Sequence, residues 1–441
     1  MALLVDLYEL VMADSYSRHD LNQPATFDLF VRDLPPHRSF LVSAGLESIL
    51  YYLEHVSFND ALLTYLRSLN LFSEAFLASL RTFRFSGDVW AIPEGEIFFP
   101  PEPLVQLTAP RIEAQLVETF LLNALNFQVM VASKAARVVL AAGDRAVVDY
   151  SPRRDHAADA ALKAARAAYL VGCAGTSNVL AGMEYGIPVY GTMAHSYVMS
   201  FPDELTAFRT LAQDFPENTT LLIDTYDTLQ GAKHAIVVAE EMAARGQRLR
   251  AVRIDSGDLV AQSRQVRALL DAHGLHQVQI VLSGELDEYK IEDLLARGAA
   301  GDAFGVGTAM GTSDDAPTMG GIYKLVEDEH GPKMKLSTGK ATLPGRKQVW
   351  RRRGSDGMVH DVIALTDERP IPGAQALLVK VMEGGRTLSS TRLEESRHRC
   401  RAGLAQLPGA LRELHPVAPP VVALSARLQA LQHTMHHVDL P

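Results

Sequence analysis

The chain has 441 residues, of which 47% are hydrophobic and 21% charged, and this length suits two or three domains. Its 52 acidic and 42 basic side chains give a formal net charge of −10, which disfavours nucleic acid as a partner. No apolar run approaches the ~20 residues that span a bilayer, and only two cysteines occur, so we expect a cytoplasmic protein without a membrane segment or a disulfide framework.

The first 140 residues predict an α+β domain. Phe27, Leu29 and Val31 alternate with polar Asp28 and Arg32, which predicts a half-buried strand. The other elements expected here are helices at residues 7–15, 43–54 and 112–142 and strands at 89–92 and 104–107.

Residues 141–328 repeat a rhythm of strand, loop and helix. Buried parallel strands form continuous apolar runs, and their alternation with helices indicates βαβ units. The expected strands are 146–148, 187–190, 221–223, 251–254, 280–282 and 303–306, and most are separated by helices such as 203–212, 232–244 and 259–273. Six or so units predict an irregular or incomplete α/β barrel, with an open doubly wound sheet as the alternative.

The rhythm is lost in the last segment, residues 329–441. Residues 334–336 and 348–350 predict a hairpin, and Arg351–Arg353 suit a solvated hairpin face rather than a nucleic-acid patch. From Glu394 onward the chain predicts helices interrupted by prolines.

Polar, charged and glycine residues follow every strand of the middle segment. These stretches are Asp149–Arg154, Gly191–Ser196, Asp224–Asp227, Arg253–Asp258, Ser283–Glu285 and Gly305–Thr308. In an α/β barrel the loops after the strands converge on one face, which carries the active site. We therefore expect the six stretches to form one site.

The last two stretches suit phosphate. Ser283 and Gly284 lead into a predicted helix, and Gly305 and Gly307 precede Thr308 in a loop whose backbone an anion can approach closely. The alternative is that these glycines only make tight turns. The pair Gly305 and Gly307 is not a dinucleotide-binding fingerprint, because the third glycine is missing.

Ionisable residues at the strand ends suit catalysis. His195 fits a general base, a metal ligand or a nucleophile that accepts a phosphoryl group, with a purely structural role as an equal alternative. Asp224 and Asp255 suit a magnesium ion or ribose hydroxyls, whereas Asp258 suits a helix N-cap. Arg253 lies inside an apolar strand and therefore requires an anionic partner or an aromatic face.

Six motifs follow one another over nearly the whole chain. They are Asp6–Leu10, Gly175–Gly182, Gly191–Ser196, Arg253–Leu259, Gly305–Thr308 and Lys340–Val349. Together they resemble the nicotinate phosphoribosyltransferase family. The resemblance implies the type II phosphoribosyltransferase fold, an irregular α/β barrel plus a second domain built from both chain ends. It also implies a homodimer in which the partner subunit completes each active site.

Members of that family transfer the 5-phosphoribosyl group of phosphoribosyl pyrophosphate (PRPP) to nicotinate, giving nicotinate mononucleotide and pyrophosphate in NAD salvage. The reaction uses Mg²⁺ and is coupled to ATP hydrolysis, and the resemblance implies that His195 is the residue phosphorylated by ATP. It further implies that Tyr150 and Arg253 sandwich the pyridine ring. Tyr8 would reach the ring bound in the neighbouring subunit.

The remaining roles are carried over from the same resemblance. Magnesium and ribose are expected at Asp224 and Asp255; the substrates at Tyr8, Tyr150, Arg153, Arg154, Ser177 and Ser196; and the phosphates at Ser256, Gly257, Ser283, Gly284, Gly305, Gly307 and Thr308.

Two segments depart from the family pattern. The stretch that usually reads Phe-Gly-Leu-Arg-Arg-Ala-Gln-Gly is Tyr150–Ala157 here, so that Tyr replaces the stacking Phe and Pro152 stiffens the loop. After Thr308 the family has a larger or basic residue where this chain has Ala309. We expect an altered pocket shape from the first departure and weaker phosphate binding from the second.

The residue at position 177 bears on whether the substrate is nicotinate, the acid, or nicotinamide, the amide. Nicotinamide-using relatives carry an aspartate there, which suits an amide donor and repels the carboxylate of nicotinate. Ser177 is neutral and can donate a hydrogen bond. Arg153 and Arg154 add positive charge one element earlier, with Arg153 the stronger candidate because Arg154 suits the surface. The acid is therefore favoured.

Other functions compete with this interpretation. A phosphoribosyltransferase for nicotinamide or quinolinate is the nearest, although quinolinate calls for more basic residues around its second carboxylate. A sugar-phosphate aldolase or isomerase is disfavoured, because no strand end offers a lysine for a Schiff base. A catalytically silent, nucleotide-binding paralogue is disfavoured because His195, Arg253 and Asp255 are all present.

Overall fold

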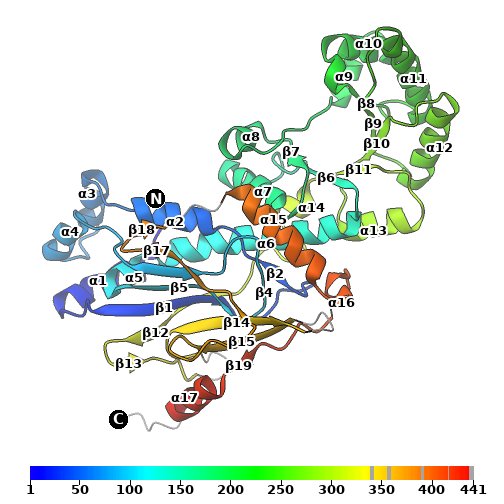
Figure 1. Cartoon of the computed structure of the whole chain (residues 1–441). Coiled ribbons are helices and arrows are strands. Elements are labelled where there is room, and N and C mark those ends of the chain that lie inside the picture. Colours follow the sequence, from blue (N-terminus) through cyan, green and yellow to red (C-terminus); the bar gives the residue numbers. More distant parts are fainter. Residues whose placement is uncertain (338–341, 355–358, 389–391, 416, 437–441) are drawn as a thin grey trace. The chain divides into compact units, whose positions relative to one another are not determined.

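The computed structural model describes residues 1–337, 342–354, 359–388, 392–415 and 417–436, which form two compact units (Figure 1). Unit 1 combines residues 1–133 with residues 316–441, and unit 2 is the continuous stretch 134–315. The boundaries predicted from the sequence lay at 140/141 and 328/329. They differ because helix α6 (Glu118–Ala142) runs through the first boundary without a break, and because strand β12 (Gly321–Asp328) already pairs with β1 (Pro24–Val31) of unit 1.

Helix α6 is the one helix in the described part of the chain that is long and apolar enough to cross a membrane. The helix meets this criterion by its mean hydropathy, although it contains no uninterrupted apolar run of that length. Of its most apolar window, 67% is buried inside the protein, and core helices pass the same test.

Unit 1 is built on a seven-stranded sheet, in which β1 occupies a central position. The strand order is β13 (Gly331–Pro332), β12, β1, β5 (Pro103–Pro110), β3 (Asp88–Ala91), β17 (Val379–Glu383) and β18 (Arg386–Thr387). The expectation of a half-buried β1 is wrong, because every residue after Pro24 in this strand is buried. Asp28 is accordingly paired inside the protein, with Lys347 at 2.9 Å and Gln106 at 2.8 Å.

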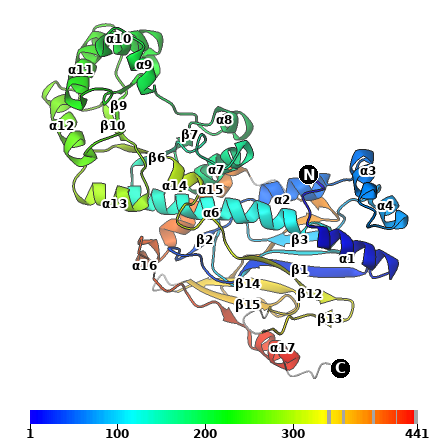
Figure 2. The same ribbon diagram turned by 180° about the vertical axis from the view of Figure 1, so that it is seen from behind.

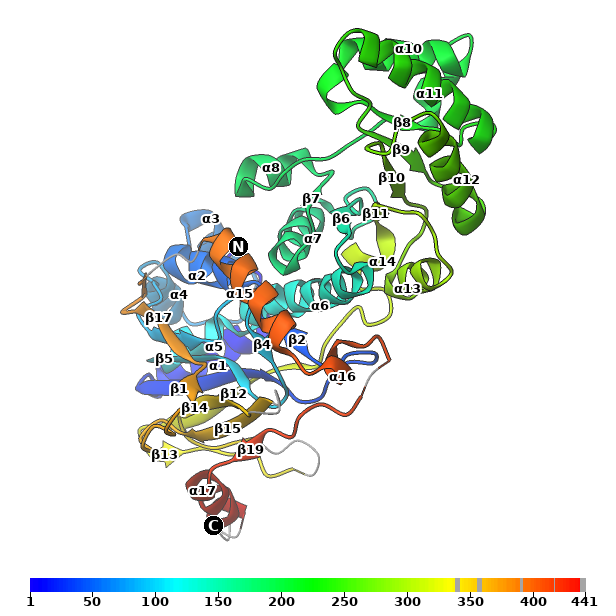
Figure 3. The same ribbon diagram turned by 45° about the vertical axis from the view of Figure 1, so that its right-hand side comes forward.

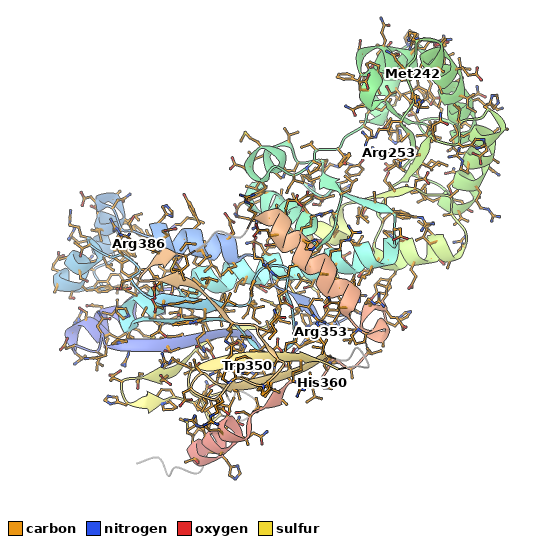
Figure 4. The ribbon with its side chains drawn as sticks, in the orientation of Figure 1. Met242, Arg253, Trp350, Arg353, His360 and Arg386 are labelled. Carbon is orange, nitrogen blue, oxygen red and sulfur yellow. The ribbon has the colours of Figure 1, made fainter. Side chains whose placement is uncertain are left out.

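The other strands of unit 1 correct the predicted hairpin. Strand β14 (Lys347–Arg353) pairs with β15 (Val359–Leu365) and not with residues 334–336. Trp350, Arg353 and His360 are labelled on these two strands in Figure 4. Arg351 is buried and bonds Asp361 at 2.6 Å, so only the other two arginines of that run are exposed.

The remaining elements of unit 1 are short strands and helices. The strands are β2 (Leu41–Val42), β4 (Ile97–Phe98), β16 (Gln375–Ala376) and β19 (Ala423–Leu424). The helices are α1 (Leu7–Arg18), α2 (Leu46–His55), α3 (Asp60–Ser68), α4 (Glu74–Leu80), α5 (Arg111–Leu116), α15 (Leu393–Gln406), α16 (Gly409–Arg412) and α17 (Ala426–His436). Figure 2 shows α17 beside β15. Of the motif at 340–349, Lys340 and Ala341 lie outside the described residues.

Unit 2 contains a curled, fully parallel sheet of six strands, which confirms the predicted irregular, incomplete α/β barrel (Figure 3). Its order is β7 (Gly175–Thr176), β6 (Ala146–Asp149), β11 (Ala303–Val306), β10 (Gln279–Leu282), β9 (Ala251–Ile254) and β8 (Thr220–Leu222). The strand predicted at 187–190 is absent. Val189 forms only one isolated bridge, to Thr176, because Pro188 has no N–H for a ladder.

Helices follow the strands of unit 2, and five of them, α8 and α10 to α13, begin at a side-chain cap. They are α7 (Ala158–Val171), α8 (Val179–Tyr185), α9 (His195–Met199), α10 (Glu204–Asp214), α11 (Thr228–Ala244), α12 (Leu259–Ala272), α13 (Glu288–Ala296) and α14 (Thr308–Gly311). Asp227, Asp258 and Asp287 each accept hydrogen bonds from the first turn of the helix that follows. Val252 of β9 and Met242 of α11 are fully buried in this core. The strands therefore end in loops held at a common edge.

Candidate active site

The carboxyl ends of β6, β9 and β10 bring functional side chains into direct contact. Arg253 projects from β9 (Figure 4), Asp255 follows the same strand, Ser283 follows β10 and Tyr150 follows β6. Adjacent parallel strands end at the same edge of a sheet, so residues that lie up to 133 positions apart become neighbours. The expected convergence of the strand exits is therefore present.

Arg253 lies at the centre of this cluster, and its guanidinium donates hydrogen bonds to three different side chains, an arrangement that we call the fork of Arg253. Nε donates to Ser283 Oγ, Nη1 to Thr192 Oγ1 and Nη2 to Asp255 Oδ1, each at 2.9 Å. Its side chain is 14% exposed, and its charge lies 5.6 Å from the ring centroid of Tyr150. The structure thus supplies both the anionic partner and the aromatic face that an arginine in an apolar strand requires.

Tyr150 packs directly against the Arg253 guanidinium. A planar ring inserted between the two needs about 7 Å, twice a van der Waals contact distance, so the two side chains must separate by an ångström or more to sandwich a substrate. Tyr150 rests on Gly305, because a Cβ there would lie 2.4 Å from the tyrosine ring. Gly305 therefore makes room for the ring, and the phosphate contact expected of its backbone stays a prediction.

Asp255 is held as a carboxylate. It accepts from Ser283 Oγ at 2.6 Å as well as from Arg253. Burial alone would raise the pKa of Asp255, but the hydrogen bonds from Ser283 and Arg253 and the charges of Arg253 and His195 outweigh it and hold the pKa below its ordinary value. The Ser283 hydroxyl accepts from Arg253 and donates to Asp255, so it positions these two side chains, and its predicted contact with a phosphate stays a prediction.

Asp224 follows β8 and supports the loop after β9. Its Oδ2 accepts from the backbone N–H of Asp255 at 2.9 Å and from Ser256 Oγ at 2.7 Å, whereas its buried Oδ1 has no hydrogen-bond partner. Within the described residues no group of three or more His, Cys, Asp and Glu side chains is placed to hold a metal ion. Asp224 and Asp255 thus offer two carboxylates, and one oxygen of Asp224 is free.

His195 is the first residue of α9. Its Nδ1 lies 3.1 Å from Thr225 Oγ1, and its Nε2 lies 4.0 Å from Asp255 Oδ2. The side chain is 38% exposed, so a ligand can reach it. The Thr225 hydroxyl therefore orients Nδ1, and Nε2 lies on the side of the Asp255 carboxylate.

The two glycine-rich loops differ in detail. Gly284 has φ +105°, and a Cβ there would lie 2.1 Å from the carbonyl oxygen of Asp255, so no other residue fits. The loop then enters α13 at the Asp287 cap. Gly307 is the N-cap of α14, which begins at Thr308. A Cβ added at Gly307 would lie 3.4 Å from the Tyr150 carbonyl oxygen, an ordinary contact distance. Gly257, in the loop after β9, is exposed and also has a positive φ, +77°.

The other predicted substrate residues lie on the surface. Arg153, Arg154 and Ser196 are exposed, and Arg154 lies 3.9 Å from Glu285. Ser177 is half-buried, and its backbone N–H donates to the Asp149 carbonyl. Tyr8 belongs to α1 of unit 1 and is 48% exposed.

Three residues of the cluster had no assigned role from the sequence. Thr192 accepts from Arg253, Thr225 contacts His195, and buried Asp149 accepts from Thr176 Oγ1 at 2.7 Å. Burial raises the pKa of Asp149 above its usual value. All three lie in the polar stretches after strands, so their position was a signal, but hydroxyl residues in loops are too common to single out.

Comparison with known proteins shows which family this chain resembles. Residues 3–126 match the nicotinate phosphoribosyltransferase N-terminal domain, and residues 146–325 match the nicotinate phosphoribosyltransferase family. A nicotinate phosphoribosyltransferase of Mycobacterium tuberculosis is 46% identical over 99% of this chain and 94% of its own length. That of Bacillus subtilis is 41% identical over 84% of this chain and 77% of its own. The crystal structure of human nicotinic acid phosphoribosyltransferase superposes with a TM-score of 0.88 at 31% identity, covering 98% of this chain and 100% of the human one.

Proposed function

The chain belongs to the nicotinate phosphoribosyltransferase family, and on this basis we propose that it transfers the 5-phosphoribosyl group of PRPP to nicotinate, coupled to ATP hydrolysis through His195. The observation that carries the proposal is the fork of Arg253, which joins Asp255, Ser283 and Thr192 beneath the Tyr150 ring. The products are nicotinate mononucleotide and pyrophosphate, and the role is NAD salvage.

The transfer requires positioning more than covalent chemistry. The bond between the ribose carbon and pyrophosphate breaks while the pyridine nitrogen bonds to the same carbon, so positive charge develops on the sugar. A ring held flat between Tyr150 and Arg253 directs its nitrogen at that carbon. The carboxylates of Asp255 and Asp224 stabilise the developing positive charge from the strand edge.

The acid is favoured over the amide as the accepting base. Ser177 is neutral, so it does not repel the carboxylate of nicotinate, and the exposed Arg153 offers a cation from the neighbouring loop. Quinolinate would need further cations for its second carboxylate. A nicotinamide enzyme and a silent paralogue remain the outcomes against which the proposal is tested.

The phosphohistidine role is supported by the orientation of His195. Because Nδ1 contacts the Thr225 hydroxyl, Nε2 is the nitrogen left to attack the γ-phosphorus of ATP. An N–P bond forms as the bond to the bridging oxygen breaks, and ADP leaves. Hydrolysis of phosphohistidine then releases phosphate. Asp255, 4.0 Å from Nε2, stabilises the positive charge that develops on the ring.

Asp224 and Asp255 suit Mg²⁺, which proteins often bind through one or two carboxylates together with substrate phosphates. The buried, unpartnered Oδ1 of Asp224 is an oxygen that a cation would satisfy. When bound, the ion would neutralise charge on the departing pyrophosphate. The residues therefore fit the cofactor.

A cytoplasmic homodimer completes the proposal. On α1, Leu7, Tyr8 and Val11 are each about half exposed, and on α8, Val179 and Met183 are 72% exposed. Apolar side chains gathered on a helix surface are typical of a protein interface. Such an interface would bring Tyr8 to the partner's substrate, as the family resemblance implies.

The test is to incubate the purified protein with PRPP, magnesium and either nicotinate or nicotinamide, with and without ATP, and to quantify the mononucleotide. We expect product from nicotinate only, stimulated by ATP. His195→Ala should abolish the stimulation, and His273→Ala, on the outer helix α12 cap, should not. Product from nicotinamide would overturn the base assignment, and no product from either base would favour the silent paralogue.

A mixing experiment tests the shared site. Tyr8→Ala and Arg253→Ala chains, each inactive alone, should regain about a quarter of the activity after joint refolding, because half of the dimers then carry one intact site. Failure to regain any activity would contradict a site shared between subunits.

A further inference from the structure

The loop that carries Tyr150 is closed by a hydrogen bond between two of its own side chains. Ser151 Oγ donates to Asp155 Oδ2 at 2.9 Å. The Ser151 backbone N–H donates to Asp149 Oδ1 at 2.9 Å, and the Ser151 carbonyl accepts from Arg154 and Asp155. Ser151 is fully buried, so the loop folds inward around this residue.

The same pair rests on the backbone of α14. A Cβ at Gly311 would lie 2.1 Å from Asp155 Oδ1 and 2.4 Å from the Ser151 Cβ, which leaves no space between loop and helix. Asp155 Oδ1 is buried without a hydrogen-bond partner, so the carboxyl gains only packing there. The loop after β6 and the helix after β11 are therefore joined at one point of tight contact.

This arrangement uses residues that depart from the family pattern quoted above. Ser151 and Asp155 stand where the pattern has Gly and Ala, and neither of those can form the hydrogen bond. Ala157 stands where the pattern has the last Gly and adopts φ +85°, a strained conformation for alanine. This chain thus closes its loop with a side-chain pair that the usual sequence lacks.

We propose that Asp155, through Ser151, is a positioning residue that fixes the Tyr150 ring at a set distance from the start of α14. The proposal rests on the proposed function, in which Tyr150 stacks on the base and Gly307 and Thr308 lie at the phosphate. The distance between ring and phosphate decides whether the ring nitrogen meets the ribose carbon. The pair adjusts the binding of the base and not that of PRPP.

Loss of the Ser151–Asp155 pair should affect nicotinate binding more than PRPP binding, because the loop after β6 and the phosphate loop after β11 are held by different contacts. Gly305 and Val306 are held by the parallel ladder of β11 with β6, so the phosphate side keeps its place without Asp155. The Tyr150 backbone N–H donates to Val306, but beyond Tyr150 the loop depends on Ser151 and Asp155. Loss of the pair should therefore loosen the ring and raise the KM for nicotinate.

The first experiment compares Asp155→Ala with Asp155→Asn. The alanine variant should raise the KM for nicotinate about tenfold, the equivalent of one hydrogen bond between partly buried groups, with the KM for PRPP changed less than twofold. The asparagine variant retains an acceptor for Ser151 and should stay within twofold of the wild type for both. Equal changes in both KM values, or none, would overturn the proposal.

The second experiment probes the contact from the opposite side. Gly311→Ala inserts a methyl group against Asp155 and Ser151 and should raise the KM for nicotinate in the same way. In a chain that also carries Ser151→Gly and Asp155→Ala the obstruction is gone, so the added methyl group should have no further effect. An undiminished effect of Gly311→Ala in that background would show that the contact does not act through the pair.

Hydrogen exchange separates a failure of this proposal from a failure of the proposed function. The amides of Arg154 and Asp155 should exchange faster in Asp155→Ala than in Asp155→Asn, whatever reaction the protein catalyses. Unchanged exchange in an active enzyme would reject the positioning role alone. An inactive wild type with the expected exchange would reject only the function.

Discussion

Replacing Arg253 with lysine separates the shape of the guanidinium from its charge. The fork makes three hydrogen bonds of 2.9 Å to three different side chains. A lysine ammonium keeps the positive charge but, as a compact point charge, can serve about one of these partners. Two charge-assisted bonds are then lost at ~1.5 kcal/mol each, the low end of their range, because partial rearrangement is possible in a site that is not fully closed.

A loss of about 3 kcal/mol corresponds to a fall of roughly 150-fold in kcat/KM for nicotinate. The assay is mononucleotide formation at saturating PRPP and ATP, with the thermal midpoint recorded to exclude unfolding. Arg250→Lys is the control, because Arg250 lies just before the same strand, is exposed, donates a hydrogen bond to Asn218 and lies 5.8 Å from the ring centroid of Tyr190. If Arg253→Lys keeps more than about a third of the wild-type kcat/KM, the fork does not organise the site and the reasoning is wrong.

Three further changes have expected outcomes. Gly305→Ala places a methyl group 2.4 Å from the Tyr150 ring, so kcat/KM for nicotinate should fall about tenfold or more while calorimetry shows unchanged PRPP binding; weakened PRPP binding would mean that Gly305 serves the phosphate instead. Lys347→Ala leaves the charge of Asp28 buried and unpaired, and urea denaturation should show a loss of about 3–5 kcal/mol, most of it recovered when Asp28→Asn is added. Burial raises the pKa of Asp155 to about 6, above its unfolded value of 3.8, so its stabilising contribution is complete below pH 3.8 and lost as pH rises through 6. The thermal midpoint of Asp155→Asn should therefore rise relative to that of the wild type between pH 4.5 and 7, by an amount equivalent to ~1–2 kcal/mol after allowance for solvent screening. A difference that stays constant with pH would refute the assignment.

The convergence of polar residues at one edge of the sheet was predictable because parallel strands carry two signals at once. Their buried bodies form apolar runs, and their carboxyl ends meet at one edge, so polar residues such as Asp224 and Asp255 after those runs point to a shared site. The barrel of unit 2 was predicted for the same reason. The helix caps, including Asp258, follow from local chemistry and needed no knowledge of the fold.

The errors concern residues whose environment is set by distant parts of the chain. Arg351 looks like a surface residue in sequence, but Glu96 and Asp361 surround it in the folded unit, where the three charges pair inside the protein. Gly305 illustrates a different limit. A glycine makes room equally for a ligand and for a neighbouring ring, and only the folded structure shows that the Tyr150 ring lies against Gly305.

The interrupted layout of unit 1 has a consequence for how the protein is made. Strand β1 cannot pair with β12 until almost 300 residues more have left the ribosome, since Phe27 pairs with Leu325. Unit 2, in contrast, is contiguous and complete once residue 315 emerges. Domains generally fold as units during synthesis, and long-range strand pairing is slow. We therefore expect unit 2 to fold on the nascent chain before unit 1 is complete, with β1 already able to pair with β5 but its other edge open until β12 emerges.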